Sequence, residues 1–373
     1  MIDLLLAATL VTTFPIEHLH DPRPLPAAAS VRDVIATGAD DFILATGPDD
    51  ELDGRTLMRV SGQRVTPLVA LAPARSGICR GSGLVAGEEG RWWYARCNHE
   101  EVEFVPSGAP SQVVRVPVGE QSVGLAPIRG SDPAVVVVSH VPSSELMMRA
   151  ELVTPSGAQM IGDFRRSGHL GFGPWTMQAH RLKDDAIALV TLEEDGHSDY
   201  RVMLRVFRDG EATESRLPFE TNRYVAVLSA ASEHGLGVVA VLPSGGGLVA
   251  MAFDPNEPQN AKPFEIDGSD AQMVARAGAA IVPLGERFAV TWANANDRSV
   301  RLSEFDRTMA LPAVHVAAEA DVRMHAPLLQ AHEEGMSVFW SLGTTRQRVL
   351  PTEAAGYLLA VELWRRLGSG AVP

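Results

Sequence analysis

Arginines recur in the loops that precede a series of short apolar runs in this chain. A planar guanidinium donates paired hydrogen bonds to carboxylate, sulfate or phosphate oxygens, so arginines gathered around one opening would bind such an anion. The alternative is that each arginine pairs with a neighbouring carboxylate and fixes one repeat to the next. The unequal spacing between the arginines and the following runs favours this alternative. The candidate ligand-binding residues are Arg75, Arg166, Arg223, Arg276, Arg323 and His325.

One acidic segment has the oxygen donors that calcium needs. Asp49, Glu51 and Asp53 alternate as at the start of a calcium loop. Gly54 could turn the chain, but Val60 stands where a closing glutamate would bind. A solvated acidic loop is therefore the favoured interpretation. A calcium-stabilised adhesion module is kept as a third functional hypothesis.

Signatures of catalysis are absent from the sequence. There is no Gly-x-Ser-x-Gly elbow, no His-Glu-x-x-His and no phosphate-binding glycine loop, and the glycine-rich segment 244–247 is typical of a hairpin turn. His18 and His20 could chelate a metal, but no third ligand cluster accompanies them, which favours a surface or linker role. We expect no catalytic residue, no metal and no cofactor. The sequence leaves enzymatic activity uncertain and favours its absence.

The chain contains two cysteines, Cys79 and Cys97. A Gly-Glu-Glu-Gly turn with its midpoint at Glu88 predicts a hairpin in which the two side chains face each other, close enough for a disulfide. A register shifted by one or two residues would instead leave two separate buried thiols, which are common in protein cores. A disulfide would indicate an oxidising compartment, either periplasmic or extracellular.

Composition excludes two classes of partner. The 373 residues carry a formal net charge of −14, whereas nucleic-acid binding needs a basic face. No apolar run reaches the roughly 18 residues that a membrane span requires. We therefore expect no nucleic-acid partner and no transmembrane segment. A peripheral position at a membrane remains open.

The strongest signal is a repeat of seven apolar runs, spaced by 43 to 52 residues. A period of roughly 40 to 50 residues built from strands predicts a β-propeller. The clearest repeat predicts strands at 279–284, 287–292, 299–305 and 311–317, which is the four-stranded antiparallel pattern of a blade. The expected fold is therefore an all-β, seven-bladed propeller. The runs begin at Phe42, Trp92, Val135, Ala186, Val238, Phe288 and Ser337.

The last repeat is too short to complete its own blade. Only nine residues follow Trp364, where the other repeats continue into a fourth strand. An unpaired sheet edge is costly, so the apolar run 4–13 is expected to supply the missing strand and close the ring. This gives one domain over 1–373, with a closing strand in 1–20, a proline-rich linker in 21–30 and the blades in 31–373.

Two alternatives concern the ends of the chain. The run 4–13 has the length of a signal-peptide core, although no positive residue precedes it. The segment 357–367 could be a capped amphipathic helix ending at Gly368. Its match to the earlier third strands, which end in an aromatic residue followed by a charge, favours a strand.

The repeat resembles the divergent propeller repeats of bacterial extracytoplasmic proteins. The matching stretches are 284–292 and 334–340, in which a glycine turn leads into a strand that ends in tryptophan. The resemblance implies a propeller fold and an extracytoplasmic location, but propellers serve as enzymes, receptors and scaffolds alike. We expect a non-enzymatic binding or scaffolding subunit with a protein or glycan partner. The alternative is a polysaccharide-acting hydrolase or lyase with its site at the channel mouth.

Overall fold

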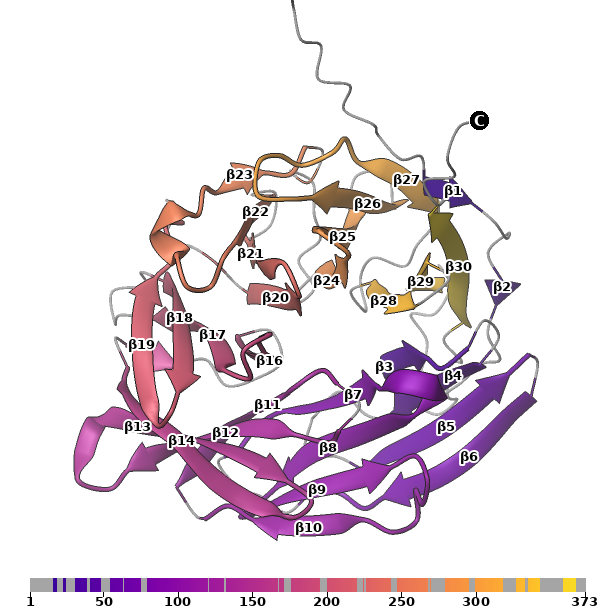
Figure 1. Ribbon diagram of the computed structural model, residues 1–373. Coiled ribbons are helices and arrows are strands. Elements are labelled where there is room, and N and C mark those ends of the chain that lie inside the picture. Colours follow the sequence, from indigo (N-terminus) through magenta and orange to yellow (C-terminus); the bar gives the residue numbers. More distant parts are fainter. Residues whose placement is uncertain are drawn as a thin grey trace, which may run out of the picture.

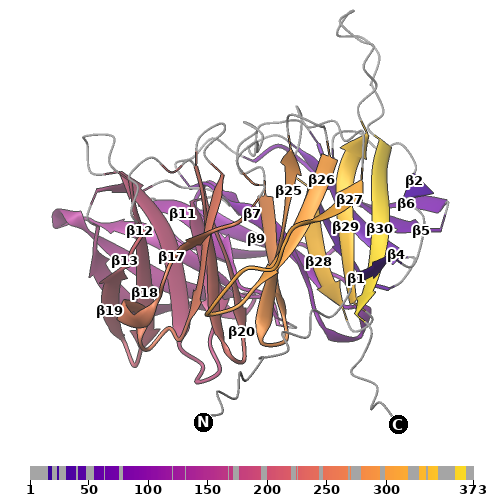
Figure 2. The same cartoon turned by 90° about the horizontal axis from the view of Figure 1, so that it is seen from above.

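The computed structural model shows an all-β propeller whose sheets stand around a common centre (Figure 1). In the view of Figure 2 the strands run through the thickness of the disc. The residues that the structure describes are 16–18, 23–24, 31–38, 41–47, 54–62, 64–74, 79–119, 121–130, 132–166, 168–170, 176–194, 200–219, 224, 226–242, 247–267, 269, 279–294, 299–317, 327–332, 335–342 and 358–366.

Six blades are each built from one continuous stretch of chain as antiparallel sheets of four strands, counted outward from the centre. Blade 1 is β3 (Val31–Ala36), β4 (Asp41–Thr46), β5 (Arg55–Ser61) and β6 (Arg64–Leu71). Blade 2 is β7 (Ser82–Ala86), β8 (Trp92–Asn98), β9 (Glu101–Pro106) and β10 (Val114–Pro117), with the short helix η1 (Glu88–Gly90) between β7 and β8. Blade 3 is β11 (Ser122–Pro127), β12 (Val135–Val141), β13 (Ser144–Thr154) and β14 (Gly157–Arg165).

Blades 4 to 6 repeat the same order. Blade 4 has an interrupted inner strand, β15 (His169–Leu170) and β16 (Met177–Arg181), followed by β17 (Ile187–Glu194), β18 (Tyr200–Arg208) and β19 (Glu211–Arg216). Blade 5 is β20 (Ala226–Ser232), β21 (Gly235–Val241), β22 (Leu248–Phe253) and β23 (Phe264–Glu265), with η2 (Pro258–Asn260) before β23. Blade 6 is β24 (Ala279–Leu284), β25 (Arg287–Asn294), β26 (Ser299–Phe305) and β27 (Val314–Ala317).

A further sheet, here called the terminal sheet, combines strands from both ends of the chain. It consists of β28 (Leu328–His332), β29 (Gly335–Leu342) and β30 (Leu358–Arg366), and the outer edge of β30 pairs with β1 (Ile16–His18) and β2 (Arg23–Pro24). The expectation of seven blades is thus not matched as stated: six blades are complete in themselves, and the terminal sheet depends on two distant segments. The predicted closing strand 4–13 lies outside the described residues.

The sequence correctly predicted the strands with the largest apolar faces. The second strands, β4, β8, β12, β17, β21, β25 and β29, coincide with the seven runs, because these strands are buried on both faces and read as continuous apolar segments. The segment 358–366 is a strand, so the helical alternative is wrong. The outer strand β27 begins at Val314 rather than 311, since Pro312 has no N–H to donate to the ladder.

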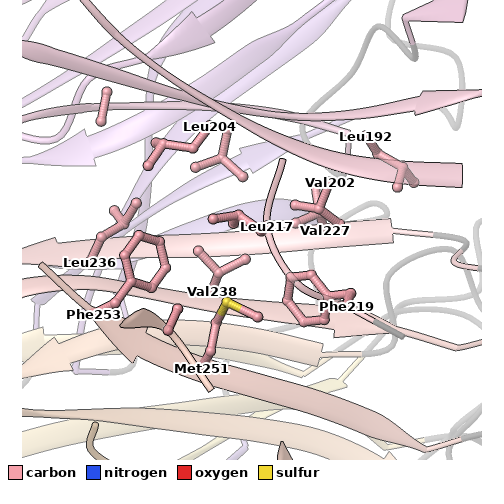
Figure 3. Packing of buried hydrophobic residues seen from close by; sticks show 14 of the residues in the cluster. Leu192, Val202, Leu204, Leu217, Phe219, Val227, Leu236, Val238, Met251 and Phe253 are labelled. Atoms are coloured by element: carbon pink, nitrogen blue, oxygen red, sulfur yellow. The ribbon is translucent and has the colours of Figure 1, made fainter. Parts of the chain in front are cut away.

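Buried apolar side chains hold neighbouring blades together face to face. Figure 3 shows one such cluster between blades 4 and 5, in which Leu204 of blade 4 shares a buried core with Val238 and Met251 of blade 5. Two further clusters join blade 3 to blade 4 and blade 5 to blade 6 in the same way. The clusters fill the gaps between sheets, so each blade is positioned by its two neighbours.

None of the helices among the described residues is long and apolar enough to cross a membrane.

The predicted disulfide between Cys79 and Cys97 is present, with a Cα–Cα distance of 5.8 Å. The hairpin register differs from the prediction: Ser82 pairs with Arg96, which places the midpoint at Glu89 instead of Glu88. Cys79 lies before β7, so it is not held to the ladder and can still reach Cys97. Both cysteines are buried between blades 2 and 3.

Gly237 allows the close approach of blade 6 to blade 5. A Cβ at this position would lie 2.5 Å from the Phe288 ring, and both residues are buried. Gly237→Ala should therefore lower the free energy of unfolding by about 1–3 kcal/mol through overpacking, measured by urea denaturation. Gly108→Ala is the matched control, because a Cβ there meets nothing within 4 Å. Equal effects of the two substitutions would contradict the packing account.

Removing the disulfide should also destabilise the fold. It closes a loop with a sequence separation of 18, for which the chain-entropy estimate is about 3 kcal/mol. The double variant Cys79→Ser/Cys97→Ser should show this loss in urea denaturation, and a reducing agent should have no further effect on it. A double variant as stable as the oxidised protein would show that the bond does not stabilise the native state.

Candidate functional site

The inner strands of the blades and of the terminal sheet line a cavity of about 250 Å³ at the centre of the propeller. Most of the lining is apolar or backbone, as in many small-ligand sites. Three ionisable side chains, Asp33, Arg129 and His180, line it together with neutral polar ones. The neutral polar residues are Ser82, Gln178, Ser229 and Gln330.

Arg129 extends from blade 3 across the channel. It follows β11, and its backbone neighbours are fixed: Ile128 bridges Ala179 of blade 4, and the Trp93 indole N–H donates to the Gly130 carbonyl at 3.1 Å. The Arg129 Nη2 donates to the carbonyl of Ile281 in blade 6 at 3.3 Å. The guanidinium thus connects residues that are 152 positions apart.

The environment of Arg129 is unusual for a cation. The side chain keeps accessible surface because it projects into the cavity, yet burial by the surrounding protein lowers its pKa, and Asp33 opposes this shift. Asp33 and Arg129 form no ion pair within 4.0 Å, and no other carboxylate of the described residues reaches the guanidinium. Charges inside proteins are normally paired, so this group lacks its usual counterpart within that part of the chain.

Asp33 holds blade 1 to blade 2. Its Oδ2 accepts a hydrogen bond from the Leu84 N–H at 2.7 Å, and its Oδ1 accepts one from the Val34 N–H at 2.9 Å. Burial raises the pKa of Asp33 to about 6, although these two N–H groups and Arg129 act in the opposite direction. Both carboxylate oxygens are therefore fixed, and the group changes charge near pH 6.

His180, Ser229 and Gln178 form a buried network between blades 4 and 5. Gln178 Oε1 accepts hydrogen bonds from the backbone N–H of Ser229 and, at 3.0 Å, from its hydroxyl. Since the hydroxyl proton is used there, His180 Nε2 donates to Ser229 Oγ at 2.7 Å. Burial lowers the pKa of His180 to about 3, and Arg129 adds to the shift. The imidazole is neutral at ordinary pH.

This arrangement does not activate a nucleophile. A serine attacks only when a base accepts its proton. Here the histidine donates to the serine oxygen, and the proton of Ser229 goes to an amide that cannot take it up. The network instead fixes side-chain positions at the channel wall.

Most of the arginines singled out by sequence fall outside the part of the chain that the structure describes. These are Arg75, Arg223, Arg276 and Arg323, and His325 lies there too. Arg166 is described: its N–H donates to the Leu146 carbonyl at 2.9 Å, and it does not line the central cavity. Burial lowers the pKa of His140, and the positive charge of Arg166 lowers it further.

The metal-binding candidates also fall largely outside the described residues, which exclude 48–53 and His20. Within the part of the chain that the structure describes, no group of three or more His, Cys, Asp or Glu residues could hold a metal ion. His18 is described only as part of β1.

The idea that arginines fix one blade to the next holds for residues that the sequence did not single out. Arg205 in blade 4 is fully buried, pairs with Glu193 at 2.5 Å and lies 4.2 Å above the ring of Phe164 in blade 3. Arg96 in blade 2 pairs with the buried Glu103 at 2.7 Å and donates to the Ala72 carbonyl at the edge of blade 1. These arginines are structural.

Asp33, Arg129 and His180 are not among the residues that the sequence patterns singled out. Asp33 lies in β3 and His180 in β16, and both of these first strands contain other polar residues, so no local pattern distinguishes the two side chains. Arg129 gave no signal either, because it follows β11 in what reads as an ordinary turn. Its position in the channel depends on inner strands from distant parts of the chain that line the same cavity.

No family model matches the sequence, and no curated protein matches it. Solved structures with a similar fold include an oligogalacturonate lyase in complex with manganese, which is 11% identical with a TM-score of 0.55 over 93% of this chain and 96% of that chain. A fungal lectin from Aleuria aurantia is 11% identical with a TM-score of 0.46 over 82% and 97%. The WD40 domain of SCAP from fission yeast is 9% identical with a TM-score of 0.47 over 94% and 90%. Similarity at these identities shows the fold alone, and the lyase comparison supports the propeller.

The buried neutral histidine should make stability depend on pH. The unfolded chain binds a proton at His180 below about pH 6.5, and the folded protein binds it only near pH 3, so stability falls as the pH drops. Asp33 acts in the opposite direction between pH 6 and 3.8, because its folded pKa is raised and protonation favours the folded state there.

His180→Gln should therefore remove an acid-sensitive contribution. Between pH 7.5 and 5.0 the natural protein should lose about 2 kcal/mol of unfolding free energy relative to this variant, measured by urea denaturation at each pH. The exposed His234→Gln is the control and should follow the natural protein. Parallel pH profiles of the natural protein and His180→Gln would show that His180 is not held neutral.

Proposed function

We propose that this protein is a non-enzymatic binding or scaffolding subunit of a larger extracytoplasmic or membrane-associated assembly. The proposal rests on the way in which the polar groups of the channel are hydrogen-bonded. Asp33, Ser229 and His180 are held by hydrogen bonds that connect neighbouring blades, and none is set up to attack or to remove a proton from a nucleophile. Polar groups fixed on a rigid frame suit recognition.

The proposal includes a ring in which the terminal sheet acts as a seventh blade. Three contacts support it. Phe339 of β29 packs edge-on against Phe42 of blade 1 with ring centroids 5.3 Å apart, and Val338 shares a buried cluster with Val282 of blade 6. The pairing of β1 with β30 adds an outer strand from the other end of the chain. In this interpretation residues 1–373 are one domain held closed by its own ends.

The proposed compartment is the periplasm or the extracellular space. The Cys79–Cys97 disulfide supports it, because structural disulfides persist in oxidising environments. The partner would be a protein, or a glycan, that meets the loops at the faces of the propeller. The loop residues proposed for contact remain Arg75, Arg166, Arg223, Arg276, Arg323 and His325.

One observation favours a second function, a hydrolase or lyase that acts on a polysaccharide. Asp33 has a pKa of about 6 and lines a cavity with Arg129, and strongly shifted carboxyl groups occur at catalytic sites. The fold-level similarity to an oligogalacturonate lyase is compatible with this function, although it carries no activity across. The fixed hydrogen bonds of both Asp33 oxygens count against it.

The experiment is affinity purification of the tagged full-length chain from its native host, followed by mass spectrometry and a turnover assay on acidic and neutral polysaccharides. We expect at least one partner protein in stoichiometric amount and no turnover. A solitary monomer that cleaves a polysaccharide, with the activity lost in Asp33→Asn, would overturn the binding role and establish the enzyme. As a control, Asp163→Asn on the exposed edge of blade 3 should change neither result.

A further inference from the structure

The Arg129 guanidinium has an incomplete set of partners. It offers five N–H donors, and the bond to the Ile281 carbonyl uses one of them. The other donors have no hydrogen-bond acceptor among the residues that the structure describes. Because the group faces the cavity, those donors point at space that a ligand can occupy.

Asp33 cannot complete this set by moving. Its two oxygens are held by the N–H groups of Leu84 and Val34, and turning the carboxylate towards Arg129 would leave those donors unsatisfied. The other polar side chains of the cavity are neutral, and His180 is uncharged; the neutral ones are Ser82, Gln178, Ser229 and Gln330. A negative charge in contact with Arg129 would therefore have to come from outside the described part of the chain.

We propose that the central channel binds a small carboxylate, whose two oxygens accept hydrogen bonds from the Arg129 guanidinium. This inference rests on the proposed binding function and names the ligand class of the channel. A carboxylate matches the planar fork of a guanidinium. A monoanion is favoured over a dianion such as phosphate, because the nearby Asp33 already contributes negative charge. The volume of about 250 Å³ admits a small organic acid.

The charges in the channel predict how binding changes with pH. The Arg129 guanidinium is positive between pH 5.5 and 7.5, as arginine is in proteins generally. His180, whose pKa is lowered to about 3 by burial, is neutral over the same range. Asp33 loses its negative charge as the pH falls through about 6, which removes repulsion against an anionic ligand. Binding of formate, which is still ionised at pH 5.5, should be tighter there than at pH 7.5.

The test is isothermal titration calorimetry with formate and acetate at constant ionic strength, with formamide and acetamide as neutral probes of the same shape. The natural protein should bind one acid per chain saturably and should not bind the amides. Arg129→Gln should weaken binding by about tenfold to a hundredfold, as expected for the loss of charge-assisted hydrogen bonds. Arg129→Lys keeps the positive charge but loses the planar guanidinium. Its affinity for the acids should lie between those of the natural protein and Arg129→Gln.

Arg149→Gln is the matched control, because Arg149 is an exposed arginine on blade 3 that pairs with Asp163 away from the channel. It should bind as the natural protein does, and thermal unfolding should show that all variants are folded. Failure of either acid to bind, or equal binding to Arg129→Gln, would overturn the carboxylate site. A partner protein recovered in stoichiometric amount would leave the binding function standing in that case, so the two proposals fail separately.

Discussion

The structure depends on the face-to-face packing of sheets. Each blade is apolar on both faces, so it is stable only between two neighbours, and the clusters between blades supply this contact with residues such as Val238, Phe253 and Phe288. This requirement arranges the sheets around a centre. It also explains why Gly237 is needed where Phe288 approaches most closely.

The same packing leaves the centre of the ring incompletely filled. Inner strands meet there edge by edge, and a cavity remains that can hold polar groups. Asp33 and His180 are tied to neighbouring blades by hydrogen bonds, so they stabilise the frame while lining the cavity. Arg129 differs, because it lines the cavity and one hydrogen bond, to the Ile281 carbonyl, uses only one of its five donors. The channel thus combines Asp33 and His180, which are fixed by hydrogen bonds, with Arg129, a cation that lines the cavity.

The sequence predicted the frame better than the site. Second strands such as β12, whose first five residues are buried, contain an apolar run that made the repeat visible. The turn between Cys79 and Cys97 brought the disulfide within reach. The predicted count of seven blades is not matched, because the last sheet takes β1 and β2 from the opposite end of the chain. The site depends on contacts between residues that are far apart in the sequence. Arg129 meets Ile281, and no local pattern in either segment encodes that approach.

We infer that Arg129 provides an anion site inside the channel. The most direct measurement is a crystal structure of the full-length protein from crystals soaked in bromide, with the ion located by its anomalous scattering. We expect a bromide peak beside the Arg129 guanidinium, on the side of the cavity. A channel in which Arg129 is paired with a carboxylate of the chain, and in which no bromide binds, would contradict it.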